Sequence, residues 1–169
     1  MISIQNIFMQ QELNKEASIP FSIRLLATGF LSGYSPVAPG TAGSLVGLLL
    51  YLIPGMEHTL VLTMMTTVLF FVGVYVSNQL EQLLGEDPQI IVVDEIIGMW
   101  ISFLLLPKTL WTIVVAFVFF RVYDTIKPPP ARKIEKIKHG WGIMLDDVVA
   151  GIYANITVRL VMLIFSRSL

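Results

Sequence analysis

The sequence feature that most restricts the fold is a pair of adjacent acids inside an apolar run. Residues 90–107 are almost uniformly hydrophobic, yet Asp94 and Glu95 stand side by side within them. Each carboxylate loses solvation when it is buried, and each raises the pKa of the other by like-charge repulsion. The pair therefore needs a neutralising cation, which is either an Arg or Lys from another helix or an oxygen-ligated ion such as Mg²⁺.

If this run is a helix, its spacing defines which residues lie on the same face as Asp94. Asp94, Ile97, Gly98 and Ile101 would share one helix face, because they follow the spacing of helical turns. Gly98 has no side chain, so it leaves room on that face for a neighbouring backbone or for a ligand. We therefore expect a closely packed helix that carries the acids near its start.

The composition indicates a membrane protein. The 169 residues are 55 % hydrophobic and only 14 % charged, and the mean hydropathy of +0.76 is too high for an ordinary soluble domain. We expect a polar N-terminal arm over residues 1–20 and a single domain over residues 21–169. The fold class is expected to be all-α, a compact bundle of about five to six helices, several of them embedded in or spanning the membrane. Residues 59–76 and 148–165 are the candidate spans, although Arg159 in the second must reach the surface or find a partner.

Charge and cysteine content exclude several functions. A net charge of −1 argues against a nucleic-acid binder, which would need a basic face. The absence of cysteine excludes disulfides, thiolate metal sites and a cysteine nucleophile. We expect no cleavable signal peptide, because residues 1–20 carry charges and no apolar core. The oligomeric state is left open.

A glycine-rich stretch precedes the first strongly apolar segment. Residues 29–44 contain four glycines and two prolines, so they form a shaped loop and not a regular helix. Thr41 is expected to be the N-cap of a helix that starts at Ala42. Free backbone N–H groups at such a helix start suit a phosphate, although on composition alone a plain turn between two helices fits better. The preceding residues 21–31 fit either a helix on the bilayer surface or a short core helix.

Three charged residues lie near the end of a later apolar segment. Arg121, Asp124 and Lys127 share one side of a helix, which should end before Pro128. A structural role needs only one Arg–Asp pair, whereas two cations that flank one acid suit a phosphate beside a metal. We favour the phosphate interpretation.

The acidic pattern returns after a basic segment. The basic residues are Arg132, Lys133, Lys136 and Lys138, and they fit either a cytoplasmic loop or a solvated helix face. We expect the cytoplasmic loop, with the acidic sites on the same side of the membrane. The following acids, Asp146 and Asp147, could be an N-cap pair at the start of a helix, where the dipole favours them. Their recurrence in so apolar a chain favours a site instead, because clustered carboxylates cannot all stay ionised without cations.

Four stretches of the chain resemble one known family. They are GYSPVAPGTAGS (33–44), IVVDEIIGMW (91–100), FRVYDTIKPPP (120–130) and GWGIMLDDVVAG (140–151), and they occur in the family's order. The set resembles the phosphatidylglycerophosphatase A family of bacterial lipid phosphatases, over about residues 21–155. Each stretch alone is a weak signal, whereas the four together are highly specific.

The resemblance implies a helical, multi-pass protein of the bacterial inner membrane. It implies an enzyme that uses Mg²⁺ to remove the phosphate of phosphatidylglycerophosphate, which leaves phosphatidylglycerol. The expected partners are this lipid and the bilayer, and not nucleic acid. The expected catalytic and metal-binding residues are Asp94, Glu95, Asp124, Asp146 and Asp147, and the expected phosphate-binding residues are Arg121, Lys127, Pro39, Gly40 and Thr41.

The residue types fit phosphate ester hydrolysis, and alternatives remain both for the attacking group and for the function itself. A phosphate monoester dianion repels nucleophiles, so its hydrolysis needs charge neutralisation and an aligned attacker. Direct attack by metal-activated water is favoured, because the chain has neither a Cys-x₅-Arg loop nor an Asp-x-Asp motif, and an aspartyl-phosphate remains the alternative. At the level of function, a small transporter or ion-binding protein would place acids near helix centres. A protein whose charges only pair helices would tolerate joint removal of an Arg–Asp pair.

Overall fold

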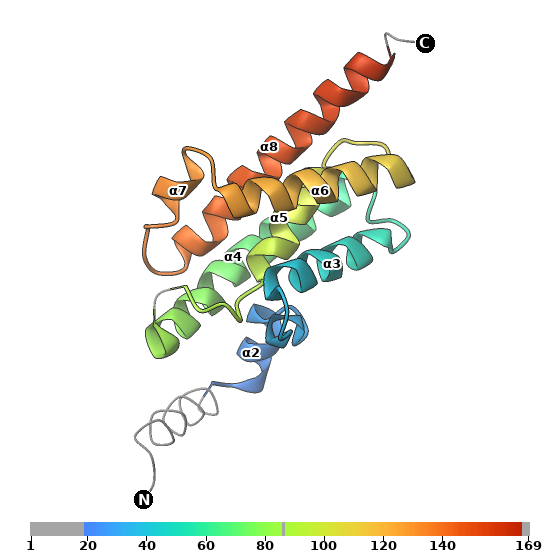
Figure 1. Ribbon diagram of the computed structural model, residues 1–169. Helices are drawn as coiled ribbons and strands as arrows, with labels where there is room; N and C mark the ends of the chain where they lie inside the picture. Colours follow the sequence, from blue (N-terminus) through green and yellow to red (C-terminus); the bar gives the residue numbers. More distant parts are fainter. Residues whose placement is uncertain (1–18, 86, 167–169) are drawn as a thin grey trace, which may run out of the picture.

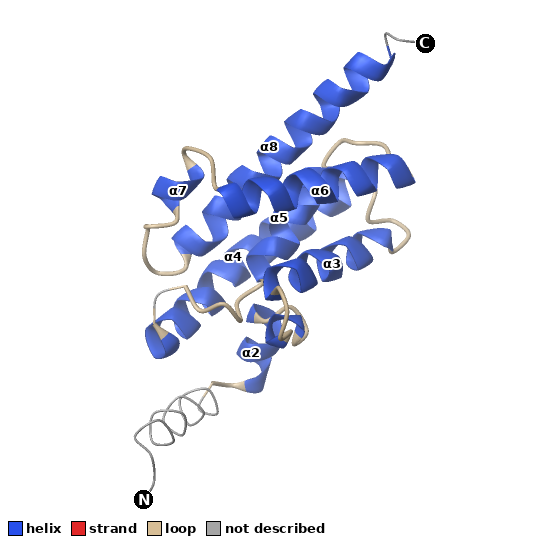
Figure 2. Cartoon of the chain, viewed as in Figure 1, coloured by secondary structure: helices blue, strands red, loops and turns tan. Residues whose placement is uncertain are grey.

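The computed structural model describes residues 19–85 and 87–166 of the 169-residue chain. In these residues the fold is all-helical without a strand, as expected (Figures 1 and 2). The elements in chain order are α2 (Phe21–Ala27), the 3₁₀ turn η1 (Ser32–Tyr34), α3 (Pro39–Leu52), α4 (Thr59–Leu84), α5 (Val93–Phe103), α6 (Leu110–Ile126), α7 (Ala131–Ile134) and α8 (Trp141–Ser166). The predicted polar arm lies, except for residues 19 and 20, outside the described residues.

Helix α5 is the centre of the bundle. It packs against α3, α4, α6 and α8, and nine of its eleven residues are buried. The run of residues 90–107 is apolar on nearly all sides, which is the pattern of a helix surrounded by other helices. The acidic pair of this run is therefore carried by the most enclosed element of the fold.

Glycines bring the backbones of α5 and α8 into contact. A Cβ atom on Gly98 would lie 2.8 Å from the carbonyl oxygen of Asp147, and one on Gly151 would lie 2.5 Å from the carbonyl oxygen of Gly98. Of the two predicted uses of the space at Gly98, the neighbouring backbone is the one observed. This contact brings the start of α5 close to the acids of α8.

Two helices, α4 over Thr59–Leu84 and α8 over Trp141–Phe165, are long and apolar enough to cross a membrane. They contain both stretches that the sequence predicted as spans. Because α8 begins at Trp141, Asp146 and Asp147 lie in its second turn and not at its start. The interpretation of these acids as an N-cap pair is therefore wrong.

Arg159, a charged residue inside the apolar helix α8, caps the C-terminal end of α5. Arg159 Nη2 donates hydrogen bonds to the carbonyl oxygens of Leu104 at 2.9 Å and Leu105 at 3.1 Å. One turn earlier in α8, Asn155 Nδ2 donates to the carbonyl oxygens of Ser102 at 3.1 Å and Leu104 at 2.8 Å. The last carbonyls of a helix have no partner within it, so these side chains supply the missing donors. Arg159 thus finds a partner, which is one of the two expected outcomes.

The segment before α3 supports the start of α5. The carbonyl oxygen of Ala27, the last residue of α2, accepts a hydrogen bond from the backbone N–H of Val92 at 2.9 Å. Ala27 and Gly29 are buried, while Phe21 and Phe30 are exposed. One side of this segment therefore belongs to the core and the other forms the surface.

Candidate active site

The helix ends at one side of the bundle surround an acidic cavity. Its volume is about 320 Å³, and its walls come from the starts of α3 and α5, the end of α6, the first turns of α8 and the segments before α5 and after α7. Of the ten predicted site residues, nine line the cavity, and Thr41 does not. The nine are Pro39, Gly40, Asp94, Glu95, Arg121, Asp124, Lys127, Asp146 and Asp147.

Three carboxylates converge in this cavity. Asp94 and Glu95 lie in the first turn of α5, Asp147 lies in the second turn of α8, and one oxygen of each lies within 4.8 Å of the others. Asp94 Oδ1, Glu95 Oε2 and Asp147 Oδ2 are buried and have no hydrogen-bond partner among the described residues. Buried acceptors are normally satisfied, and a set of oxygen ligands alone suits a hard cation such as Mg²⁺. The donor set therefore fits this ion.

Burial changes the acidity of the pair on α5. Loss of solvation, followed by the charges of Glu95 and Asp147, raises the pKa of Asp94 well above its ordinary value. Burial also raises the pKa of Glu95 to about 7, although its contact with Asp94 and the guanidinium of Arg121 act in the opposite direction. Both carboxyls are therefore hard to ionise together, as the sequence predicted for an adjacent pair that lacks a cation.

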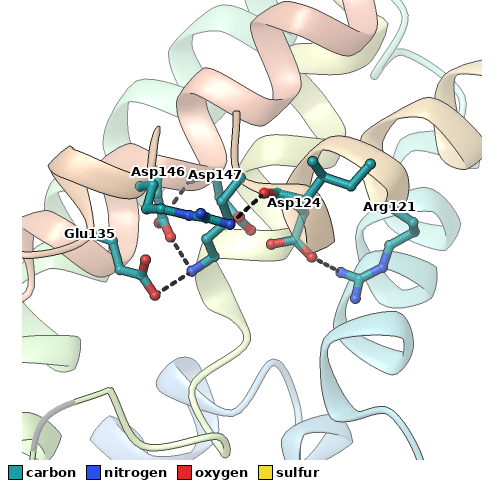
Figure 3. Close-up of polar contacts among 8 residues, drawn as sticks. Arg121, Asp124, Glu135, Asp146 and Asp147 are labelled. Carbon is teal, nitrogen blue, oxygen red and sulfur yellow. Dashed lines mark hydrogen bonds and ion pairs between the residues drawn. The ribbon is translucent and has the colours of Figure 1, made fainter. Parts of the chain in front are cut away.

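Arg121 joins two walls of the cavity. Its Nη1 atom forms an ion pair of 2.8 Å with Asp124 Oδ2 on the same helix, as Figure 3 shows. The same Nη1 atom donates a hydrogen bond of 3.2 Å to Ser44 Oγ on α3. A guanidinium has five N–H donors, so other donors of Arg121 stay available to an anion in the cavity.

Lys127 has different partners from those that its spacing suggested. Its Nζ atom lies 2.6 Å from Asp146 Oδ2 and 2.9 Å from Glu135 Oε1 (Figure 3). The prediction that Lys127 and Arg121 both flank Asp124 is therefore wrong. Lys127 stands just after the end of α6 with a positive φ of 48°, so it no longer follows the helical spacing. Burial lowers its pKa, but the hydrogen bonds to the two acids raise it on balance, so the ammonium stays charged.

The start of α3 rests on the acidic cluster. The helix begins at Pro39 with Ala38 as its N-cap, so the prediction of a Thr41 cap and a start at Ala42 is wrong. Proline suits the first helical position because it lacks the N–H that would stay unpaired there. A Cβ atom on Gly40 would collide with Glu95 Oε1 and would lie 3.1 Å from Arg121 Nη2. Gly40 thus allows the positive end of this helix to approach the site.

Three polar residues of the cavity were missed by the sequence prediction. Asp87 and Gln89, on the segment before α5, and Glu135, after α7, line the cavity with the predicted residues. Burial raises the pKa of Asp87 above its ordinary value, although the nearby charge of Lys127 acts in the opposite direction. Asp87 stood in a recognisably acidic stretch, whereas Glu135 was a single acid among lysines and carried no pattern that distinguished it from a solvated residue.

Fold and site together define an all-helical protein with an acidic cavity of oxygen ligands at one end of a bundle, and with two helices able to cross a membrane. Comparison with known proteins agrees with this class. The chain belongs to the phosphatidylglycerophosphatase A family, whose model matches residues 25–162. None of the solved structures matches the chain significantly.

Curated relatives carry two kinds of name. A protein of Bacteroides thetaiotaomicron named "Putative phosphatidylinositol-3-phosphatase" is 44 % identical over 142 residues, which cover 79 % of this chain and 89 % of that protein. Proteins named phosphatidylglycerophosphatase A are 43 % identical over 135 residues in Escherichia coli, covering 76 % of each chain, and 39 % identical over 148 residues in Haemophilus influenzae, covering 85 % of this chain and 91 % of that one. The relatives are all named as phosphatases of phospholipids.

Proposed function

We propose that this protein hydrolyses the phosphate monoester of phosphatidylglycerophosphate to phosphatidylglycerol and inorganic phosphate, and that it requires Mg²⁺. The observation that carries the proposal is a set of three carboxylates near Arg121, each of which has one buried oxygen without a hydrogen-bond partner among the described residues. The family and the names of the Escherichia coli and Haemophilus influenzae relatives support the choice of lipid.

The chain's own residues divide into two groups. Asp94, Glu95 and Asp147 would hold the metal, because their free oxygens converge and each lacks another donor. Bound Mg²⁺ would neutralise the charge of the ester and make a water molecule more acidic. Asp124 and Asp146 are already paired with Arg121 and Lys127. Their role is then to orient these two cations.

Arg121, Lys127 and the start of α3 would bind the phosphate. The guanidinium offers a planar set of donors to two phosphate oxygens, and the ammonium adds a point charge. The positive end of α3 at Pro39 and Gly40 points to the same anion-binding role. Together they would stabilise the charge on the phosphate oxygens while water attacks phosphorus.

The membrane placement is also a proposal. We infer a multi-pass protein of the inner membrane with the cavity at the cytoplasmic surface. The support comes from the segment between α6 and α8, the two helices that contribute Arg121, Asp124, Asp146 and Asp147 to the cavity. This segment is basic, and basic loops remain in the cytoplasm. Its basic residues are Arg132, Lys133, Lys136 and Lys138. The transporter alternative is less well supported, because the acids that line the cavity gather near helix ends on one side of the bundle and not near helix centres.

A phosphatidylinositol phosphate is a second candidate substrate, because the name of the Bacteroides thetaiotaomicron relative refers to that class. Both lipids carry a phosphate monoester on a polyol headgroup. The same acids and cations would serve for either, so the residues of the cavity described above do not separate the two substrates.

Phosphate release from both lipids in mixed micelles tests the proposal. Purified protein with Mg²⁺ should release phosphate from phosphatidylglycerophosphate faster than from phosphatidylinositol 3-phosphate, and excess EDTA should abolish release. Full turnover in EDTA would contradict the metal requirement, and a reversed preference would favour the second substrate. Glu57→Gln is the control variant, because Glu57 pairs with Lys108 at 2.9 Å away from the cavity.

A further inference from the structure

Lys127 is held by two acids that come from different parts of the chain. Asp146 belongs to α8, and Glu135 directly follows α7 as its C-cap residue. Their carboxylate oxygens lie 2.6 and 2.9 Å from Lys127 Nζ. A lysine ammonium has three N–H donors, so these two contacts leave one donor for another acceptor. Because all three residues line the cavity, that acceptor would be a group bound there.

The position of Glu135 is built into the fold. The segment between α6 and α8 folds back onto α8, where the backbone N–H of Gly142 donates to the carbonyl oxygen of Ile137 at 3.0 Å. A Cβ atom on Gly142 would collide with the carbonyl oxygen of Glu135, so only glycine allows this close approach. Farther along α8, Tyr153 Oη donates to the carbonyl oxygen of Pro129 at 2.6 Å. The segment that carries Glu135 is thus tied to α8 at both of its ends.

We propose that Glu135 is a positioning residue for substrate binding, which acts by holding the ammonium of Lys127 at the cavity wall. The inference rests on the proposed phosphatase function and deepens it. Lysine is a compact charge on a flexible four-carbon chain, so a single acid fixes its distance but not its direction. Asp146 alone would let the ammonium swing toward the acids of the cavity. With Glu135 on its other side, the third N–H stays directed toward the phosphate oxygens.

The proposal predicts a specific kinetic change. Glu135→Ala should raise KM about tenfold, the loss of one charge-assisted contact of ~1.4 kcal/mol. Its kcat should stay within about twofold, because Asp94, Glu95, Asp147 and Arg121 are untouched. Glu135→Gln keeps a hydrogen-bond acceptor and should recover part of the affinity. A residue that served folding alone would instead lower the amount of active protein without a change in KM.

A double-mutant cycle with Lys127→Met separates action through Lys127 from direct action. If Glu135 works through Lys127, Glu135→Ala should raise KM no further in the Lys127→Met background. Glu57→Ala is the matched control, because Glu57 also pairs with a lysine at 2.9 Å but does not line the cavity. That variant should keep the wild-type KM.

The outcomes are distinct. A wild-type KM in both Glu135 variants, or a full additional increase in the Lys127→Met background, would overturn the inference while the phosphatase function stands. A wild-type protein that releases phosphate from neither lipid would overturn the proposed function and the inference with it. Circular dichroism of each variant in detergent confirms that the helices are intact, and Glu135→Gln carries the test if Glu135→Ala does not fold.

Discussion

Replacing Asn155 by leucine should destabilise the protein, although it makes a candidate membrane helix more apolar. The amide of Asn155 donates to the carbonyl oxygens of Ser102 at 3.1 Å and Leu104 at 2.8 Å, and its oxygen accepts from Arg159 Nε at 2.8 Å. Leucine has a similar size and fills the same space, so the change isolates the polar contacts. Hydropathy alone predicts the opposite sign, because leucine inserts into a membrane more readily than asparagine.

The magnitude follows from the groups that lose their partners. In the Asn155→Leu variant the carbonyl oxygen of Leu104 still accepts a hydrogen bond from Arg159. The carbonyl oxygen of Ser102 loses its donor, the amide of Asn155, and no other donor to it is observed among the described residues. An unsatisfied buried polar group costs ~1–3 kcal/mol, and leucine recovers part of this through apolar contact. We therefore expect a net loss of about 1–2 kcal/mol, which for a chain of this size lowers Tm by roughly 2–8 °C.

Thermal unfolding in detergent, followed by circular dichroism, measures this loss. Ile156→Leu is the control, because the neighbouring Ile156 is 49 % exposed and a conservative surface change shifts stability by no more than about 0.5 kcal/mol. A Tm of Asn155→Leu equal to or above that of the wild type would refute the argument that Asn155 caps α5.

Three further predictions concern the site, the packing and the topology. Asp147→Asn should lower phosphate release at least about 100-fold while helicity and Tm stay near wild type, because it removes the charge of a proposed metal ligand but keeps its size; unchanged turnover would remove Asp147 from the site. Gly98→Ala should lower stability by about 1–3 kcal/mol, because the new methyl group would meet the ring of Phe120 and the backbone of α8; a detergent melting curve that matches wild type would contradict the backbone contact. Lys133→Cys, in a chain without other cysteines, should react with a membrane-impermeant maleimide only after cell lysis, and labelling of intact cells would place the basic segment outside.

Much of the fold could be predicted from the sequence, because the evidence for it is local. Long apolar runs define α4 and α8 whatever they pack against, and the prolines after Lys127 end α6 where expected. The acids of the site were recognisable for a related reason. Carboxylates in an apolar run are costly to bury, so Asp94, Glu95 and Asp147 were conspicuous before their geometry was known.

Only the tertiary structure decided which charges meet. Helical spacing suggested Asp124 as the partner of Lys127, but one residue with a positive φ turned the lysine toward Asp146 and Glu135. The sequence showed that Arg159, inside an apolar run, needs a partner or a way to the surface. Its partner is the carbonyl oxygen of Leu104, which lies more than fifty residues earlier in the chain, just after the end of α5. A charged side chain pairs with whatever the packing of distant helices brings within about 4 Å, and local sequence carries no record of that distance. The sequence therefore determined which residues need partners, and the packing of the helices around α5 determined which partners they have.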